Sequence, residues 1–402
     1  MVTRRIQQDM AEAAEILQRG GLVAVPTETV YGLAGNGLDE QAVSLIYEVK
    51  GRPAIKPLSL MVPDESAMER YCLEVPAQAH ALARHFWPGP LTIVLKAKDS
   101  IPSIVLAGGS TVGLRCPDHA MTLDVLRVCG LPLAAPSANP SGEASPKTAD
   151  EVLAYFDGKI DAVIDGGPCG IGKESTLIDM SAAPYRILRQ GALPAETIAD
   201  ALVEEMLVVG ITGGSGCGKT TVLRELEAHG ALILDCDEIY HELLADSAEM
   251  LSELDSAFPG TVHDGALDRA ALGAVVFASA EKLERLNAIT HRYVSMEVDR
   301  RLREHAMSGG TLAGIDAVEL FSSGIAERCD TVIGVLADFE ARAERIMARD
   351  HISRERAESR IRAQRPDAYY LQHCDHIVYN NADRESFQAL CRQQFKEILK
   401  HG

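Results

Sequence analysis

Residues 213–220 read Gly-Gly-Ser-Gly-Cys-Gly-Lys-Thr, and they begin just past the middle of a chain of 402 residues. The apolar run 206–211 comes directly before them, and residues 220–229 predict a helix with Leu223 and Leu226 on one face. A glycine-rich loop that links a strand to a helix and ends in Lys-Thr is typical of sites that cradle nucleoside triphosphates. The alternative, a glycine-rich turn without a ligand, does not explain the strand and the helix. We therefore predict that the second half of the chain binds a nucleoside triphosphate.

Each position of this loop has an expected role. Glycines let the backbone approach phosphate closely, so that N–H groups and the helix N-terminus can hold the anion. These positions are Gly213, Gly214, Gly216 and Gly218. Lys219 is expected to reach the β- and γ-phosphates, Thr220 to offer its hydroxyl to Mg2+, and Thr221 to lie beside the bound ATP. The expected ligands are ATP and Mg2+.

Composition limits the class of protein. Apolar residues make up 47% of the chain and charged residues 24%, which is typical of globular domains and not of disorder. The formal net charge of -19 is shared almost equally by the two halves, so tight direct binding of nucleic acid is not expected. Nine cysteines without a metal-binding spacing indicate a reducing compartment, and no apolar run predicts a signal peptide or a membrane span. We expect a cytoplasmic location.

The length allows two domains, and we predict them at 1–205 and 206–402. A predicted helix over 195–206 runs almost directly into the strand before the phosphate loop. In the first half, short β-rich runs alternate with helical patterns, which predicts a twisted open α/β sheet. The predicted strands are 22–25, 91–96, 111–115, 131–135, 162–164, 176–178 and 185–188, and the predicted helices are 8–19, 39–50, 76–85, 119–129 and 148–156.

Four polar clusters in the first half are candidates for a site. They are residues 26–32, 50–53, 136–142 and 172–176. A basic pair with hydroxyls and loop backbone donors suits a polyphosphate or a small carboxylate ligand. The alternative is structural: Lys50 and Arg52 would cap a helix C-terminus and Ser-Ala-Asn-Pro would be only a turn. The residues alone leave both interpretations open.

The clusters belong to an ordered series of motifs that resembles a known family. PTETVYGLA, KGRP, VGLRCPDH, PSANPSG, ESTLID and ILRQGALP follow one another between residues 20 and 195. This series resembles the YrdC family of threonylcarbamoyl-AMP synthases. The resemblance implies that L-threonine, bicarbonate and ATP are converted to threonylcarbamoyl-AMP and pyrophosphate. A partner tRNA threonylcarbamoyl transferase would then modify tRNA with this activated product.

The resemblance also implies roles for individual residues. Lys50 and Arg52 would bind the ATP phosphates and act in catalysis, with Ser137, Asn139, Ser175 and Arg189 lining the nucleotide site. Thr27, Tyr31 and Arg115 would lie near threonine and its carbamate. Catalysis would depend on positioning and electrostatics, because the carbamate itself is the nucleophile. Some family members have a histidine after the Pro-Leu that follows KGRP, whereas this chain has Ser59-Leu60-Met61.

In the second half, two further groups of charged residues are candidates for phosphoryl transfer. The apolar run 231–234 ends in Asp235-Cys236-Asp237, which would place carboxylates at a strand end as a base or a metal ligand. Helix N-capping is the alternative for either aspartate. Arg342, Arg345 and Arg349 recur at helical spacing and suggest a lid over the phosphates, with a solvated basic helix face as the alternative.

The motifs ITGGSGCGKTT, ILDCDEIYHELL, GALDRAALGAVVF, LNAITH, RIMARDHISRERAESRIRAQ and IVYNN resemble dephospho-CoA kinase. This resemblance implies a P-loop kinase with a parallel sheet, a helical acceptor-binding region and a lid, which phosphorylates the ribose 3′-hydroxyl of dephospho-CoA. By motif, Asp237 would be the catalytic base, Lys219 would act on the phosphates, and Asp235 and His241 would bind the substrate. Arg345 and Arg349 would belong to the lid, and Asn381 would lie near the ATP base.

Two positions differ from the pattern of many dephospho-CoA kinases. His241 stands in place of an arginine, and Ser322-Ser323 stand where those kinases have an acidic residue after Leu-Leu-Phe. We expect a weaker acceptor phosphate contact from histidine, because an unperturbed imidazole is largely neutral at neutral pH. The sequence as a whole predicts a bifunctional enzyme with two independent ATP sites. Two rivals remain: one half could only sense nucleotide, or the kinase half could act on another nucleoside monophosphate.

Overall fold

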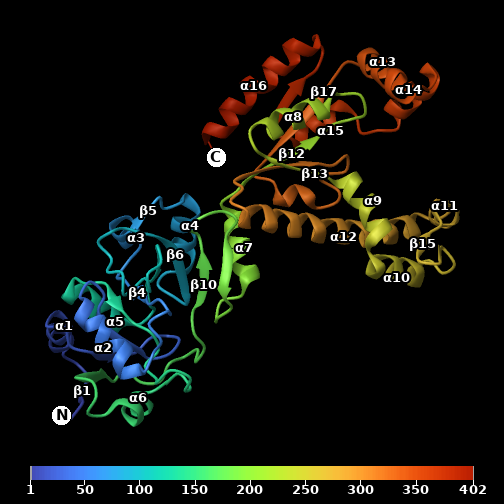
Figure 1. Cartoon of the computed structure of the whole chain (residues 1–402). Helices are drawn as coiled ribbons and strands as arrows, with labels where there is room; N and C mark the ends of the chain where they lie inside the picture. Colours follow the sequence, from blue (N-terminus) through green and yellow to red (C-terminus); the bar gives the residue numbers. More distant parts are fainter. Residues whose placement is uncertain (1, 402) are drawn as a thin grey trace. The chain divides into compact units, whose positions relative to one another are not determined.

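The computed structural model describes residues 2–401, and the chain forms two compact units. The chain up to Glu205, with Met307–Gly309, makes up the first unit, and the rest from Met206 onwards makes up the second. Figure 1 follows the chain through both units. Each unit is an α/β structure, as the sequence predicts.

The first unit is built on one large mixed sheet. Among the described residues the sheet has 11 strands, in the order β1-β9-β2-β3-β8-β4-β7-β6-β10-β11, with β5 paired to β6. The strands are β1 Arg4–Ile6, β2 Val23–Val25, β3 Gly32–Asn36, β4 Ser59–Met61, β5 Cys72–Leu73, β6 Leu91–Ala97, β7 Thr111–Arg115, β8 Leu133–Ala134, β9 Ala162–Ile164, β10 Thr176–Asp179 and β11 Arg186–Arg189. The sheet contains parallel pairs such as β4 with β7 and antiparallel pairs such as β6 with β7.

Helices cover this sheet and carry the local signals that begin and end them. They are α1 Met10–Gln18, α2 Glu40–Lys50, α3 Ser66–Tyr71, α4 Ala77–Phe86, α5 Ala120–Cys129, α6 Ala149–Phe156 and α7 Ala195–Glu204. Asp39 caps the N-terminus of α2, and Gly51 ends the helix in the left-handed conformation with φ 56°. This ending turns the chain sharply after Lys50, so that Arg52 leaves the helix axis.

Four short strands of the first unit, β1, β3, β4 and β5, and the short helix α3 were not predicted from the sequence. β1 has only three residues, and β3 reads Gly-Leu-Ala-Gly-Asn, in which glycines weaken the strand pattern. A Cβ on Gly35 would lie 2.9 Å from Leu22 Cδ2, so the close approach of neighbouring segments explains this glycine. All the predicted helices and strands are present, and their ends lie within two residues of the predicted ones.

The second unit contains a parallel sheet of five strands among the described residues, in the order β13-β16-β12-β17-β18. The strands are β12 Leu207–Thr212, β13 Leu232–Asp235, β16 Leu312–Asp316, β17 Thr331–Leu336 and β18 His376–Tyr379, and a separate hairpin pairs β14 Val262–His263 with β15 Ala266–Leu267. Carboxyl ends of parallel strands meet at one edge, where ligands usually bind. β12, β13 and β16 therefore bring the phosphate loop, Asp235 and Asp316 to the same edge.

The second unit has nine helices among the described residues, and two sets of them pack in apolar clusters of their own (Figure 1). They are α8 Lys219–Ala228, α9 Cys236–Asp246, α10 Ala248–Ala257, α11 Arg269–Val276, α12 Ala280–Met307, α13 Phe339–Asp350, α14 Arg354–Arg362, α15 Asp367–His373 and α16 Arg384–His401, with a 3-10 turn at Ile325–Arg328. α9 to α12 share an apolar cluster that includes Leu254 and Ile289, and α13 and α14 share a smaller one. Within residues 2–401, no helix is both long and apolar enough to cross a bilayer.

Candidate functional sites

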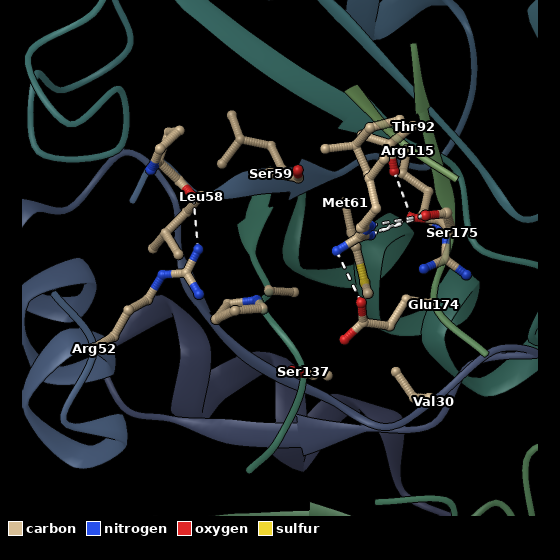
Figure 2. Close-up of a pocket in the computed structure, with 17 residues that line it drawn as sticks. Val30, Arg52, Leu58, Ser59, Met61, Thr92, Arg115, Ser137, Glu174 and Ser175 are labelled. Atoms are coloured by element: carbon tan, nitrogen blue, oxygen red, sulfur yellow. Dashed lines mark hydrogen bonds and ion pairs between the residues drawn. The ribbon is translucent and has the colours of Figure 1, made fainter. Parts of the chain in front are cut away.

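A cavity of about 180 Å³ lies in the first unit over β4, β6 and β7. Its polar lining comes from seven separate places in the sequence: Arg52, Ser59, Thr92, Arg115, Ser137, Glu174 with Ser175, and Arg189. Figure 2 shows Arg52 on one side of the cavity and Glu174 with Ser175 on the other. Three arginines thus face one small cavity, which suits a ligand with several negative charges.

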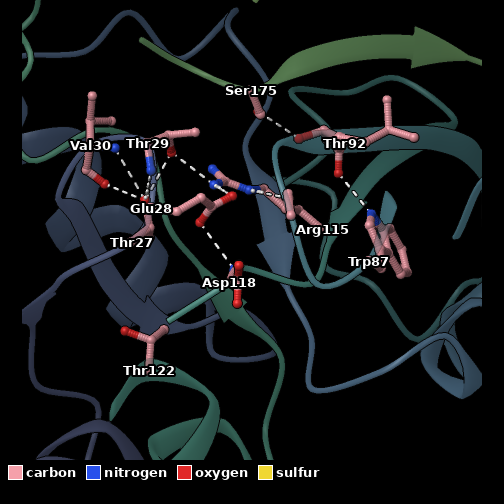
Figure 3. A network of polar contacts seen from close by, with 12 residues as sticks. Thr27, Glu28, Thr29, Val30, Trp87, Thr92, Arg115, Asp118, Thr122 and Ser175 are labelled. Atoms are coloured by element: carbon pink, nitrogen blue, oxygen red, sulfur yellow. Dashed lines mark hydrogen bonds and ion pairs between the residues drawn. The ribbon is translucent and has the colours of Figure 1, made fainter. Parts of the chain in front are cut away.

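Arg115, at the end of β7, is held by a nearly buried ion pair (Figure 3). Its Nη2 donates to Glu28 Oε1 at 2.7 Å and to Thr29 Oγ1 at 2.8 Å, and its Nε donates to Gly89 O at 3.3 Å. The two charged side chains are only 9% and 13% exposed. Glu28 also accepts the backbone N–H of Asp118 at 3.0 Å. The guanidinium is therefore fixed in orientation at the cavity wall.

Arg189 and Ser175 form a second polar group at the cavity. Arg189 Nη2 donates to the Ser175 carbonyl at 2.9 Å and to its Oγ at 3.2 Å, and Nη1 pairs with Glu174 Oε2 at 3.0 Å. Ser175 Oγ lies 2.8 Å from Thr92 Oγ1. Burial lowers the pKa of Arg189 below its usual value. Glu174 balances part of this charge, and any anionic ligand would compete with it for Arg189.

Lys50 is buried behind the cavity wall and holds the 136–142 segment. Its ammonium donates to the carbonyls of Ser137 and Asn139, so the basic cluster and the Pro-Ser-Ala-Asn-Pro segment are brought together. Burial, together with the nearby charge of Arg52, lowers the pKa of Lys50 to about 7. Asn139 Oδ1 is buried without a hydrogen-bond partner among the described residues. Arg52 lines the cavity and donates to the Pro57 carbonyl at 3.0 Å.

Thr27 and Tyr31 are buried and support the 26–32 loop, and they do not line this cavity. Thr27 Oγ1 donates to the Val30 carbonyl at 2.6 Å, and Tyr31 OH donates to the Gly167 carbonyl at 2.8 Å. Burial raises the pKa of Tyr31 to about 12. Of the nine residues proposed for this half, Arg52, Arg115, Ser137, Ser175 and Arg189 line the cavity.

In the second unit the phosphate loop joins β12 to α8, as predicted, and Lys219 begins the helix. Lys219 Nζ donates to the Gly213 carbonyl at 3.3 Å and lies 3.7 Å from Asp316 Oδ1. Burial raises the pKa of Asp316 to about 6, and the nearby Asp235 and Asp237 add to the shift, whereas Lys219 opposes it. Asp316 Oδ1 is buried without a hydrogen-bond partner among the described residues. A carboxylate oxygen that lacks a hydrogen bond and lies beside a phosphate loop fits a Mg2+ site.

The two aspartates after β13 have different surroundings. Asp235 caps α9, because its Oδ1 accepts the N–H groups of Asp237 and Glu238 at 2.9 and 3.2 Å. Asp237 instead lies in the wall of a cavity of about 280 Å³. The cavity lining includes the polar side chains Asp237, Tyr240, Asn287, His291, Glu319 and Ser323. N-capping therefore accounts for Asp235, and Asp237 is free of that role.

Arg342 and Arg345 of α13 contact the phosphate loop backbone. Arg342 is 5% exposed and its Nε donates to the Ser215 carbonyl at 3.1 Å, which excludes a solvated face at this position. Arg345 Nη1 donates to the Gly216 carbonyl at 3.1 Å. Arg349 is exposed and pairs with Asp350 at 2.7 Å.

Asn380 and Asn381 of the IVYNN motif have separate partners. Asn380 is buried and donates to the Cys217 carbonyl at 2.9 Å, whereas Asn381 pairs with Asp338 through two 2.9 Å hydrogen bonds. Thr220 and Thr221 lie in the first turn of α8, where Thr220 is exposed. His241 Nδ1 lies 3.3 Å from Arg269 Nη2, so an arginine from α11 stands beside the histidine.

Several residues of these sites were missed from the sequence. Glu28 and Glu174 lie inside clusters that we identified, but a sequence does not show which cation each carboxylate faces. Asp316 had a local signal, because it ends the apolar run 312–315 as Asp235 ends 231–234. Gln364 ends the quoted motif RIMARDHISRERAESRIRAQ, but the motif does not show its contact with Ser215, which is 149 residues away.

Each half of the chain matches a different protein family. Residues 15–191 match the Sua5/YciO/YrdC family model, described as telomere recombination, and residues 207–386 match the dephospho-CoA kinase model. The threonylcarbamoyl-AMP synthase of Pyrococcus abyssi is 45% identical over 203 residues, which are 50% of this chain and 60% of that protein. A putative threonylcarbamoyl-AMP synthase of Methanocaldococcus jannaschii is 40% identical over 46% of this chain and 86% of that protein.

The dephospho-CoA kinase of Corynebacterium glutamicum is 36% identical over 196 residues, which are 48% of this chain and 98% of that protein. The match thus includes nearly the whole of that kinase. By contrast, the chain spans only 52–60% of the length of three threonylcarbamoyl-AMP synthases that it matches.

Proposed function

The chain belongs to the Sua5/YciO/YrdC family through residues 15–191 and to the dephospho-CoA kinase family through residues 207–386, and we propose that it is a bifunctional enzyme. Residues 1–205 would form threonylcarbamoyl-AMP and pyrophosphate from L-threonine, bicarbonate and ATP. Residues 206–402 would transfer the γ-phosphoryl group of ATP to the 3′-hydroxyl of dephospho-CoA. The presence of a cationic cavity in one unit and a phosphate loop in the other is the observation that carries this proposal.

In the first unit, we assign Arg52, Arg115 and Arg189 to the negative charges of the substrates. The amine of threonine and bicarbonate would first form a carbamate with loss of water. An oxygen of this carbamate would then attack the α-phosphorus of ATP, the bond from the α-phosphorus to the bridging oxygen of the β-phosphate would break, and pyrophosphate would leave. Arginines at fixed positions stabilise charge that develops on the leaving group, because they need little reorganisation. Lys50 supports this site by holding the carbonyls of Ser137 and Asn139.

In the second unit, Asp237 would accept the proton of the attacking hydroxyl, since it lines a cavity and follows β13, which ends at the same sheet edge as β12 and the phosphate loop. ADP would leave after the hydroxyl oxygen bonds to the γ-phosphorus. Lys219 would bind the transferred phosphate. Thr220 and Asp316 would hold Mg2+, which neutralises charge on the phosphates when bound.

We propose a cytoplasmic location, which the nine free cysteines support because thiols persist in a reducing compartment. A tRNA threonylcarbamoyl transferase would be the partner that uses the product of the first unit. The acidic chain has no charge pattern for tight tRNA binding of its own.

Phosphorus NMR of the purified chain with ATP and Mg2+ tests both activities. Threonine with bicarbonate should produce pyrophosphate, and dephospho-CoA should produce ADP. If only one product formed, the silent unit would be a nucleotide sensor or a scaffold. Faster ADP formation with adenosine or AMP than with dephospho-CoA would refute the assigned acceptor.

A further inference from the structure

Two side chains distant in sequence hold the phosphate loop of the second unit at Ser215. Gln364 Oε1 accepts the Ser215 backbone N–H at 2.9 Å, and Gln364 Nε2 donates to Ser215 Oγ at 2.9 Å. Arg342 donates from Nε to the Ser215 carbonyl at 3.1 Å and from Nη2 to Gln364 Oε1 at 2.8 Å. Both backbone polar groups and the hydroxyl of Ser215 are therefore bound by side chains.

Arg342 and Gln364 lie so close to the phosphate loop that the residue before Ser215 must be a glycine. A Cβ on Gly214 would lie 2.1 Å from Arg342 Nη2 and 2.9 Å from Gln364 Oε1. Contacts this short would force the buried arginine away from the loop. Gly214 thus serves the contact with Arg342 and Gln364, in addition to any approach of phosphate.

Gln364 also belongs to a packed pair of helices. Its backbone N–H bonds to the Ile361 carbonyl at 3.2 Å, directly after α14. Buried Ala357 and Ile361 of α14 pack with Ala343 and Ile346 of α13. The helix pair therefore contacts the loop from both of its helices, through Arg342 of α13 and through Gln364 after α14.

We propose that Gln364 is a positioning residue for ATP in the second unit. It fixes the Ser215 peptide, so that the N–H groups that follow in the loop stay directed toward the phosphates. It acts through the loop backbone and not on the reacting atoms. The proposal rests on the phosphotransfer activity proposed above, and it adds a residue whose role depends on a contact 149 positions away.

Steady-state kinetics of Gln364→Leu tests the proposal, because leucine has similar size and no polar atoms. Loss of the carboxamide leaves the Ser215 N–H without its acceptor, and we expect the KM for ATP to rise about tenfold, equal to about 1.4 kcal/mol. The KM for dephospho-CoA should stay within about twofold of wild type. Gln364→Glu keeps the acceptor for Ser215 and Arg342, so it should restore most of the ATP affinity.

Gln372→Leu is the matched control, because Gln372 is exposed on α15 in the same unit. Threonine-dependent pyrophosphate formation by the first unit should be unchanged in every variant. A lower kcat with both KM values unchanged would indicate loss of folded protein and would overturn the proposal. An ATP KM for Gln364→Leu equal to that of the Gln372→Leu control would also overturn it.

Hydrogen exchange of the 213–218 backbone separates this proposal from the proposed activity. The Ser215 amide should be protected in the wild-type chain and should exchange faster in Gln364→Leu. Faster exchange without any dephospho-CoA-dependent ADP in the wild type would leave the contact established and refute the kinase assignment. Equal exchange in the two proteins would refute the contact.

Discussion

Substitution of Glu28 by glutamine tests the ion pair that orients Arg115. The pair spans 2.7 Å, and its side chains are 9% and 13% exposed. Removing one partner of a buried pair costs about 3–5 kcal/mol, because a charge stays behind without its counterion. Glu28→Gln keeps the shape and one oxygen, so we expect about 3 kcal/mol, the low end of that range.

Arg4 and Glu12 provide a matched control at the same distance of 2.7 Å. Their side chains are 66% and 37% exposed, and exposed pairs contribute about 0–1 kcal/mol. Glu12→Gln should therefore change the stability of the first unit by less than about 1 kcal/mol. The two variants have the same substitution and the same ion-pair distance, and they differ in how deeply the ion pair is buried.

Trp87 is the one tryptophan in the sequence and lies in the first unit, so its fluorescence reports unfolding of that unit. A domain of about 200 residues loses about 2–4 °C in Tm per kcal/mol. Glu28→Gln should lower the fluorescence-monitored Tm by about 6–12 °C. The same variant should lose threonine-dependent pyrophosphate formation, while dephospho-CoA-dependent ADP formation remains. Equal Tm shifts for Glu28→Gln and Glu12→Gln would refute the reasoning.

Four further substitutions test single residues of the two sites. Lys219→Ala should lower ADP formation at least about 100-fold and leave threonine-dependent pyrophosphate formation unchanged, and loss of both activities would contradict independent sites. Lys50 has a pKa lowered to about 7, so its charged form and the kcat/KM for ATP in the first unit should decline as pH rises through 7. Lys50→Arg should move this decline to higher pH, and an identical pH profile would exclude Lys50 as its cause. Asp316→Asn should lower ADP formation about 100-fold at neutral pH, because the carboxylate that would hold Mg2+ is lost, and an unchanged rate would exclude this role of Asp316. Arg269→Ala should raise the KM for dephospho-CoA about tenfold if this arginine binds an acceptor phosphate in place of His241, and an unchanged KM would leave that contact to other residues.

The sequence determined those features that a short segment specifies by itself. The phosphate loop needs glycines, a lysine and a threonine in consecutive positions between a strand and a helix, so residues 213–220 show both the structure and the ligand class. Helix boundaries depend on local hydrogen bonds and backbone conformation, and the helix predicted at 39–50 differs from α2 by one residue at its start. The order of motifs also placed each half in a family, which the comparisons confirm.

The tertiary structure decided which charges meet and which side chains reach a cavity. Glu28 pairs with Arg115 across 87 positions, and Gln364 bonds Ser215 across 149. Such pairs arise when strands and helices far apart in sequence pack together, and no local periodicity encodes them. Asp235 and Asp237 show the same limit: they are two residues apart, yet one caps a helix and the other lines a cavity. A carboxylate's role depends on the donors and solvent around it, and those surroundings exist only in the folded chain.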